Sequence, residues 1–477
     1  MAVTLQITDG TTTVNFANDT GPELRSEYLP AFATPTGDGT LPPDIAEAIP
    51  VVVHITSGDN LAGTLQDIAF LADQAARYAS NKHQTPVWFH RKIDDESNPI
   101  RYLMKSVHYT PDALFGGILD IGGPCLTDGR TGILTVVHHP YGERDSAVGA
   151  SGTDSVSVIG GLVDYDVVMG DVPARMYYTH IDDLAAARVY RQFWMGFRSD
   201  LRAGGDAANV ASLWELEDGT PNVAGDSAVT TDATASPGGG GNTKVRCTFL
   251  TQTGWTERVS ILMTDVTAAA NVGYQVGSYV VLLRAMVNQG AAQVQLRSGS
   301  GAGAVVWREG PVVDISDTAW NIYNLGTVEW PTRNLHAAPT GLFAATYDQR
   351  DGMAIWARVK PPAAVIPTQF DMDCLILIPA DEYFVHVQSA DVSATADELY
   401  ALVSPEDTPE SVTVDGSSNW IQSTNPIQTI GEGIPVGDGR LFIAIANDND
   451  GTAPAFGDVV DVELSTYPRW VYFRGAE

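Results

Sequence analysis

The sequence predicts a mainly β, multi-domain protein of β-sandwich and jelly-roll type, whose N-terminal α+β domain carries one packed helix. Three observations predict this class. The 477 residues include 46 glycines and 27 prolines but only 18% charged residues, a composition typical of turn-rich β structure. Short apolar or alternating runs recur along most of the chain, as expected of strands. A clear helical period occurs at residues 60–80. The length suits two to four domains.

The first 140 residues predict a β-sheet packed by this helix. Apolar and polar residues alternate on both sides of a DGTTT turn (9–13), which indicates a hairpin over residues 3–16. From Leu61 to Tyr78, apolar residues recur at three- and four-residue steps, which predicts an amphipathic helix with Asp59 or Asn60 as its cap. Further strands are expected at 49–56, 85–93, 101–110 and 132–139, after a polar loop at 34–44.

Strand-like runs divide the rest of the chain. Residues 155–182 hold two of them, SVSVIG and ARMYYTHI, separated by GDVPA (170–174). QFWMGFRS (192–199) then opens a series of short strands at the spacing of a sandwich or jelly roll. The runs DCLILIPA, RLFIAIAND and VVDVELSTY are among the strands expected near the C-terminus. We predict three domains: an N-terminal domain at 1–184, an inserted jelly roll at 185–368, and a C-terminal β domain at 369–477 that completes the sandwich begun at 150–184.

The charge argues against several classes of partner. With 27 basic and 58 acidic residues the net charge is −31, and such a surface repels nucleic acid and anionic lipid. Three distant cysteines, Cys125, Cys247 and Cys374, predict neither a disulfide framework nor a zinc site. The first 16 residues lack the features of a signal peptide, and no run of 18 apolar residues occurs. We therefore expect a soluble protein with no membrane insertion.

The stretch LTVVHHPYGERD (134–145) raises the question of a metal or proton-transfer site. Neighbouring side chains of a strand point to opposite faces, so His138 and His139 cannot easily bind the same ion. Zinc pairs use an i, i+2 step on a strand or an i, i+4 step on a helix. Pro140 removes a donor from the strand ladder. We interpret His138, His139 and Glu143 as the end of a strand at a sheet edge.

Motifs for catalysis are missing from the sequence. There is no GxSxG elbow, no Walker A loop and no Rossmann fingerprint after a strand, and GGGG (238–241) is interpreted as a linker. NDNDGT (447–452) fails the EF-hand pattern, so a solvated turn is favoured there over a structural calcium ion. Acidic clusters at 94–96, 215–218, 381–382 and 448–450 are expected by chance in so acidic a chain, although a glycosidase would need such a pair. We predict no enzymatic activity and no catalytic, cofactor-binding or metal-binding residue.

Tryptophans are frequent in the predicted middle sandwich, at Trp255, Trp307, Trp320, Trp330 and Trp356. Large aromatic side chains on sandwich faces fill a core or an interface in most cases, and we expect this for most of the five. Aromatic rings can also stack on sugar rings, so one or two exposed members would make a glycan-binding surface.

Several segments, in order, resemble structural proteins of bacteriophage tails, of the tail-tube and distal-tail type. They are LQITDGTTTVNF (5–16), the helix of LxxxLxxIxxLxxxA type, PVWF (86–89), LTVVHHPYGE (134–143), GDVPA, LIPADEYF (377–384) and YPRWVYFRGA (467–476). Gly142 departs from the pattern, in which tryptophan often stands. Residues 185–365, through SYVVLLRAMV and WNIYNLGTVEWP, resemble a carbohydrate-binding-module-like jelly roll inserted into that frame.

The resemblance implies a non-enzymatic virion protein, made in the host cytoplasm and built into the tail. Its copies would form homo-oligomeric rings, commonly hexameric, that stack around a channel through which DNA passes without specific binding. Other tail or baseplate proteins would be partners, and the inserted jelly roll would decorate the outside. The alternative is a carbohydrate-binding host-adhesion protein of the tail tip, with surface glycans as partner. A glycoside hydrolase is the least favoured hypothesis.

Overall fold

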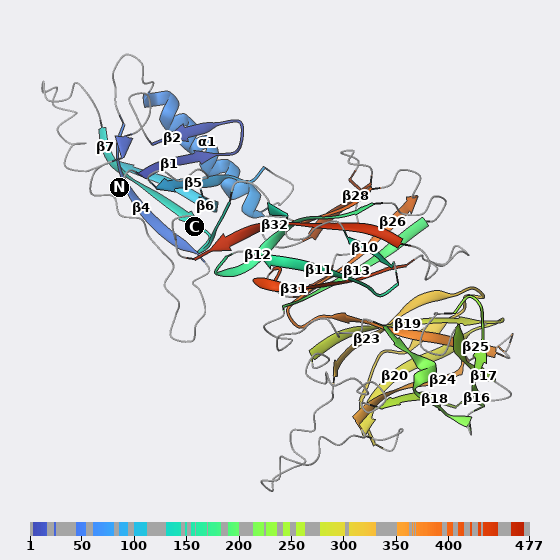
Figure 1. The fold of residues 1–477 in the computed structure, drawn as a ribbon. Coiled ribbons are helices and arrows are strands. Elements are labelled where there is room, and N and C mark those ends of the chain that lie inside the picture. The colour runs from blue at the N-terminus through green and yellow to red at the C-terminus, as the bar shows by residue number, and fades with distance from the viewer. Residues whose placement is uncertain are drawn as a thin grey trace, which may run out of the picture.

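Four β-sheets and one long helix make up the part of the chain that the computed structural model describes (Figure 1). The predicted class, mainly β with sandwiched sheets and one packed helix, is confirmed. The described residues are 3–16, 23–24, 44–53, 61–80, 85–93, 100–111, 130–144, 148–149, 154–157, 159–168, 170–182, 189–199, 213–223, 226–235, 242–248, 254–262, 277–300, 305–330, 351–361, 365, 367, 369–393, 398–403, 409–414, 420–421, 428–430, 433–446 and 459–471.

The largest sheet, called the long sheet below, has fifteen described strands from both ends of the chain. They are β1 (Val3–Thr8), β2 (Thr13–Asn15), β3 (Glu23–Leu24), β4 (Ile45–Val53), β5 (Trp88–Ile93), β6 (Ile100–Pro111), β7 (Arg130–His138), β8 (Gly142–Arg144), β9 (Val148–Gly149), β10 (Asp154–Ser157), β12 (Val172–Asp182), β27 (Glu398–Val403), β28 (Pro409–Val414), β29 (Trp420–Ile421) and β32 (Val459–Trp470).

The predicted N-terminal hairpin is confirmed, because β1 and β2 pair antiparallel. Asp9 shapes the turn between them. Its carboxylate accepts the backbone N–H groups of Thr11 and Thr12 at 2.9 and 2.7 Å. Gly10 adopts a φ of +90°, a conformation that favours glycine. The DGTT sequence thus supplies both the side-chain acceptor and the backbone freedom that the turn requires.

Helix α1 (Leu61–Ser80) covers the N-terminal strands of the long sheet (Figure 1). Its predicted apolar stripe is confirmed at Ile68, Leu71 and Ala75, which lie in one core with residues of β1, β5, β6 and β7. The proposed caps, Asp59 and Asn60, lie outside the described residues. Strand β6 pairs with β5 in its first part and with β7 in its second, so it joins two parts of the sheet beneath the helix.

Strand β32 ties the C-terminal end of the chain to earlier segments. It pairs with β12 along one side and with β8, β9 and β10 along the other. Figure 1 shows it running from the helical region toward the neighbouring sheets. The C-terminal strands therefore complete a sheet begun by residues 142–182.

The five-stranded sheet lies beside the long sheet. One core contains Val462 and Leu464 of β32, Phe193 and Phe197 of this sheet, and residues of the sandwich described next. Its strands follow the order β11 (Gly161–Val168), β31 (Gly437–Ala446), β13 (Val189–Ser199), β26 (Tyr383–Ser393) and β30 (Gln428–Ile430).

The remaining two sheets have six described strands each and face each other in a sandwich around a second core. The inner sheet contains β14 (Leu213–Glu215), β16 (Ser227–Thr231), β17 (Thr243–Thr248), β19 (Gly277–Val287), β23 (Asn321–Trp330) and β25 (Gln369–Pro379). The outer sheet contains β15 (Thr220–Pro221), β18 (Thr256–Leu262), β20 (Ala292–Ser300), β21 (Val305–Glu309), β22 (Val313–Ile315) and β24 (Asp351–Val359). A short 3-10 helix, η3 (Leu216–Asp218), joins the two sheets.

Part of the inner sheet is buried on both faces. Strand β25 directs Leu375 and Leu377 into the sandwich core, whereas Ile376 and Ile378 pack with the five-stranded sheet. Strands β13 and β31 are likewise buried along most of their length. Double burial explains why DCLILIPA, QFWMGF and LFIAIA read as continuous apolar runs without alternation.

Two runs lie in other sheets than the sequence predicted. QFWMGFRS, expected to open the jelly roll, is part of β13 and pairs with β26 and β31. DCLILIPA, expected in the C-terminal domain, belongs to β25 and pairs with β17 and β19 of the inner sheet. A run without alternation indicates burial but not the sheet in which it lies. The divisions at 184/185 and 368/369 stay predictions.

The strands around GDVPA also differ from the prediction. Strand β11 (GLVDYDVV) was missed, and β12 begins at Val172, inside the segment expected to separate two strands. Gly170 makes the turn with a φ of +134°, and a Cβ there would lie 2.4 Å from the carbonyl oxygen of Arg469. Close backbone approach therefore sets this turn, which composition alone does not reveal. Among the described helices, none is long and apolar enough to cross a membrane.

Candidate functional site

The two histidines of HHPYGE lie at the end of β7, but this strand is not at an edge. It pairs with β4 on one side and β6 on the other, so the predicted edge position is wrong. His138 is fully buried, with its Nε2 3.2 Å from the Glu47 carboxylate and its Nδ1 2.6 Å from the carbonyl oxygen of His139. Glu47 also accepts a hydrogen bond from the buried guanidinium of Arg91. His138 thus belongs to a buried ionic cluster of the N-terminal core.

Glu143 has a separate structural role. Its carboxylate lies 3.1 Å from Nε and 3.0 Å from Nη2 of Arg101 on β6, and 3.8 Å from Nε of Arg469 on β32. It therefore links strands from the two ends of the chain. Gly142 beside it has no room for a side chain, since a Cβ would lie 2.3 Å from Cγ2 of Ile100. This packing explains why the tryptophan common in the resembling proteins is absent here.

His139 faces a different environment from His138. Burial lowers the pKa of His139 to about 4, and the positive charges of Lys105 and Arg469 act in the same direction. The imidazole is therefore neutral at physiological pH. No group of three or more His, Cys, Asp or Glu side chains that could hold a metal occurs among the described residues.

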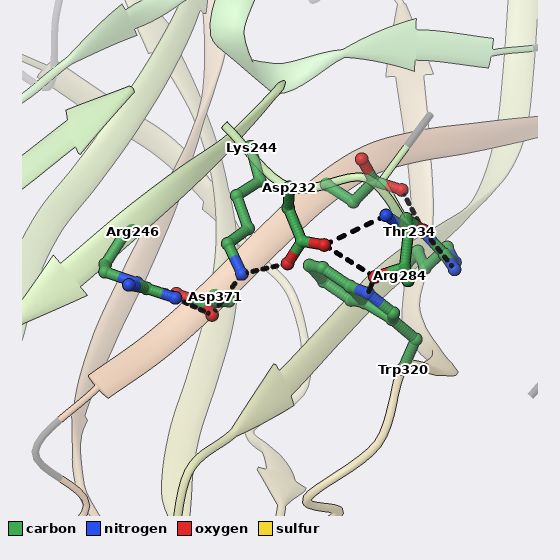
Figure 2. A network of polar contacts seen from close by, with 8 residues as sticks. Asp232, Thr234, Lys244, Arg246, Arg284, Trp320 and Asp371 are labelled. Atoms are coloured by element: carbon green, nitrogen blue, oxygen red, sulfur yellow. Dashed lines mark hydrogen bonds and ion pairs between the residues drawn. The ribbon is translucent and has the colours of Figure 1, made fainter. Parts of the chain in front are cut away.

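A larger polar cluster covers part of the free face of the inner sheet (Figure 2). Lys244 lies between the carboxylates of Asp232 and Asp371, and Arg246 donates two hydrogen bonds to Asp371 at 2.8 and 2.9 Å. Arg284 donates to Asp373 in the same face. Sequence reasoning missed this cluster, although TKVRCT and DMDC place charges at every second position of β17 and β25.

The cluster holds a turn over the sheet. Trp320 donates from its indole to the Thr234 hydroxyl at 2.9 Å, and Arg284 donates to the Thr234 carbonyl oxygen at 3.2 Å (Figure 2). Asp232 accepts the backbone N–H of Thr234 at 2.9 Å. Because these charges pair with one another, the cluster is a structural clamp and leaves no charged group for a ligand.

Two acidic clusters of the sequence, at 215–218 and 381–382, lie within the described residues. Glu217 accepts a hydrogen bond from Thr243 at 2.6 Å, and burial raises its pKa while that bond lowers it. Glu382 accepts the backbone N–H and the hydroxyl of Ser199 at 2.6 and 2.7 Å. Residues 94–96, 447–452 and the GGGG segment lie outside the described residues, as does Cys125. Cys247 and Cys374 are buried free thiols.

The free face of the outer sheet carries a different set of side chains, called the Arg–Trp face below. Strand β20 alternates Val294 and Leu296, which enter the sandwich core, with polar residues on the opposite face. Strand β24 alternates in the same way, with Ile355 and Ala357 in the core. The Arg–Trp face comprises Trp255, Gln293, Gln295, Arg297, Trp356 and Arg358.

Strand register brings these residues together. Gln293 pairs with Arg358, and Gln295 pairs with Trp356, across β20 and β24. Trp255 directly precedes β18, the strand on the other side of β24. Both indoles are half-buried, neither inside the core nor fully exposed. The face is thus a row of aromatic rings flanked by planar amide and guanidinium groups.

Guanidinium groups stack on both rings. The Cζ of Arg297 lies 4.3 Å from the ring centroid of Trp356 and 5.7 Å from that of Trp255, and the Cζ of Arg358 lies 4.6 Å from Trp255. The indole N–H of Trp356 has no hydrogen-bond partner among the residues that the structure describes, and its nitrogen is covered by protein atoms. Unlike the clamp on the inner sheet, this face includes an arginine, Arg358, that has no carboxylate partner among the described residues.

The sequence singled out two of the residues on this face. Trp255 and Trp356 were among five tryptophans expected mostly in the core, yet neither belongs to the sandwich core, and Trp320 lies in the clamp. The side chains of Trp307 and Trp330 lie outside the described residues. The arginines and glutamines were missed, although AQVQLRSG and IWARV show the alternation that places them on one face.

The comparisons with known proteins return weak structural likenesses. A scan against models of protein families and a search of curated proteins found no match. The chain is similar to the N-terminal CBM22-1–CBM22-2 tandem domain of Xyn10C from Paenibacillus barcinonensis, with 10% identity, a TM-score of 0.20, and coverage of 60% of this chain and 99% of that one. A predicted secreted protein of Parabacteroides distasonis aligns with 10% identity, a TM-score of 0.15, and coverage of 59% and 99%.

Similarity at this level carries no argument about fold or activity. Neither of these two structures is a phage-tail protein, so the resemblance to tail proteins stays a prediction from the sequence.

Proposed function

We propose that this chain is a non-enzymatic carbohydrate-binding protein and that the Arg–Trp face is its binding surface. One observation carries the proposal: half-buried indoles of Trp255 and Trp356 lie beside planar amide and guanidinium groups on the free face of a sandwich. A binding surface of this kind combines apolar area with a few fixed polar groups.

The chemistry of a sugar ring fits these groups. One face of a pyranose carries mainly C–H groups, which pack against the flat, electron-rich face of an indole. Its hydroxyls both donate and accept hydrogen bonds. The amides of Gln293 and Gln295 hold Nε of Arg358 and Arg297, so the terminal guanidinium nitrogens of the two arginines supply donors in a fixed plane.

A glycan array probed with the full chain tests the proposal. Binding that is lost in Trp356→Ala and Trp255→Ala supports it. Trp88→Ala is the matched control, because Trp88 is also half-buried and stacks on an arginine, Arg101, at 4.3 Å, but lies in the long sheet. An array on which the full chain binds nothing contradicts the proposal.

A second candidate function is the virion role implied by the sequence resemblance. Among the described strands, β2 pairs with β1 alone and β29 pairs with β28 alone, so the long sheet ends in strands with unpaired backbone groups. Such edges are commonly covered by another chain, and ring closure between identical copies does so. In this function copies form hexameric rings in a phage tail, with tail or baseplate proteins as neighbours.

Negative-stain images of the purified chain test the second candidate. Closed rings or stacked rings support it, and monomers at every concentration contradict it. The two functions are compatible, because a sandwich on the outside of a tail can bind host glycans. Such a protein would be made in the host cytoplasm and act in the virion.

A further inference from the structure

We propose that the Arg–Trp face selects acidic glycans, with Arg297 and Arg358 binding the carboxylate of a uronic acid unit. This inference rests on the proposed carbohydrate-binding function and specifies its ligand class.

Both guanidinium groups are fixed in place. Nε of Arg297 donates to Oε1 of Gln295 at 3.0 Å, and Nε of Arg358 donates to Oε1 of Gln293 at 2.9 Å. Stacking on the indoles fixes the planes of the two groups. Each arginine is therefore held by its Nε and its π face, which leaves the terminal nitrogens to point elsewhere.

The terminal nitrogens of the two arginines make no hydrogen bond within the described residues. Arg297 does form an ion pair with Glu309, at 3.3 Å from Nε, whereas Nε of Arg358 is bonded to Gln293. Arg358 has no carboxylate partner in the described part of the chain. Two other arginines stacked on aromatic rings do have one, since Arg101 pairs with Glu143 and Arg284 pairs with Asp373, whereas Arg144, stacked on Trp470, has none among the described residues. The Arg–Trp face differs from the site of Arg144 in bringing two stacked guanidinium groups together.

Three carboxylates, those of Glu257, Glu309 and Asp314, lie near this face, and each is offset in a different way. Asp314 accepts hydrogen bonds from Gln293 at 3.0 Å and from Lys360 at 2.6 Å, so a lysine neutralises its charge. Glu309 lies 3.3 Å from Nε of Arg297 and is half-exposed, so solvent screens it. Glu257 pairs with Trp356 across β18 and β24, and burial raises its pKa while a hydrogen bond from Ser260 lowers it. An anion repelled by the rest of the surface thus meets two guanidinium groups here.

The geometry of a carboxylate matches that of a guanidinium group. A guanidinium presents two parallel N–H groups that fit the two oxygens of a carboxylate, and such charge-assisted bonds are stronger than those to a hydroxyl. A uronic acid has a carboxylate on the same ring whose C–H face stacks on an indole. A neutral sugar leaves the terminal nitrogens bound to water. The face therefore prefers the acidic sugar.

The experiment compares polymers that differ in the carboxylate alone. The probes are polygalacturonate, polyglucuronate and polymannuronate, each with its carboxyl-reduced counterpart, titrated into the full chain. We expect at least one uronate polymer to bind about tenfold or more tightly than its reduced form. Arg358→Gln and Arg297→Gln should remove most of this preference. Arg308→Gln is the matched control, since Arg308 is exposed on the neighbouring strand β21 and should leave the preference unchanged.

Each of the following results would contradict the inference, the proposed function, or both. Equal binding of each polymer and its reduced form overturns the inference and leaves the carbohydrate-binding function standing. A loss of preference in Arg308→Gln as large as in Arg358→Gln also overturns the inference, because it indicates diffuse charge attraction. Preference for dextran sulfate with no binding of any uronate polymer overturns the assignment of a carboxylate. Binding of no polymer in either series, together with a blank glycan array, overturns both proposals.

Discussion

The guanidinium of Arg91 donates a hydrogen bond to the carboxylate of Glu47 in the N-terminal core, where the two side chains are 0% and 1% exposed. The strands that carry them, β4 and β5, are held in one sheet through β6 and β7. The rings of Phe89 and Tyr102 lie 5.7 and 4.9 Å from the guanidinium carbon, so the ion pair is enclosed by aromatic side chains. A charge buried in this way depends on its partner.

Removing one member of this pair should therefore be costly. Glu47→Ala removes this carboxylate from beside the buried guanidinium of Arg91, and we expect a loss of about 3–5 kcal/mol in the free energy of unfolding. The double variant Glu47→Leu/Arg91→Met replaces both charges with apolar groups and should recover most of the loss. Urea denaturation followed by far-UV circular dichroism measures both. A loss below about 1 kcal/mol in the single variant would show that the pair is solvated in solution.

Acid should weaken the clamp on the inner sheet through Asp232. Burial raises the pKa of Asp232, but hydrogen bonds from Lys244 and Thr234 outweigh it and hold the pKa at about 2, below the ordinary 3.8. Because the pKa of Asp232 is lower in the folded state, its ionised carboxylate stabilises the fold. This stabilisation is complete above pH 3.8 and is lost as the pH falls toward 2. Because Asp232 is partly exposed and solvent screens its charge, the contribution is smaller than the full shift implies and amounts to about 1–2 kcal/mol.

The variant Asp232→Asn isolates that contribution. At pH 6 the parent chain should be more stable than the variant, and the difference should shrink as the pH falls from about 4 to 2. Denaturation midpoints of the two proteins across this range give the measurement. A difference that does not change with pH contradicts the assignment.

Gly196 tests the contact between the five-stranded sheet and the inner sheet. A Cβ on Gly196 would lie 2.3 Å from the carbonyl oxygen of Pro379 and 2.7 Å from Cγ2 of Ile378. Gly196→Ala must push the sheets apart, and we expect it to cost about 1–3 kcal/mol. Gly254→Ala is the control, since nothing lies within 4 Å of a Cβ there. Equal melting temperatures of the two variants would mean that the sheets do not approach this closely.

His139 should titrate well below an ordinary histidine. Burial, Lys105 and Arg469 lower its pKa to about 4 from 6.5. Because folding favours the neutral imidazole, protonation of His139 destabilises the folded state. The stability associated with the neutral ring is complete above pH 6.5 and is lost as the pH falls through 4. NMR spectra of the chain labelled in its imidazole rings should show one resonance, absent in His139→Gln, with a midpoint near 4. A midpoint near 6.5 would show that the ring is solvated.

The sequence predicts the local elements of this fold better than their partners. The hairpin and helix were predictable because alternation at Leu5 and Ile7 and the stripe through Ile68 and Leu71 report burial on one face. Strands β13 and β25 have no such asymmetry, so the sequence does not show which sheet each of them joins. β11 was missed although Asp164 and Asp166 alternate with Val163 and Tyr165, which is a strand signal.

The candidate site was predictable in part. Trp255 and Trp356 stood out as residue types, but their place on the free face follows from the register of β18, β24 and β20, which only tertiary pairing fixes. The same holds for Arg358, whose neighbours on this face come from other strands. Conversely, HHPYGE was interpreted as the end of a strand and not as a metal site, but its sequence could not reveal the carboxylate partner of His138, because Glu47 lies 91 residues away.

Isothermal titration with a glycan that the parent chain binds is the most direct test that the Arg–Trp face holds carbohydrate. Stacking of a sugar on an indole is expected to contribute about 0.5–1.5 kcal/mol, so Trp356→Ala should weaken binding about 3- to 10-fold. Trp88→Ala should leave the affinity unchanged. Equal affinities of the parent chain and Trp356→Ala, with both proteins folded, would contradict the assignment of this face.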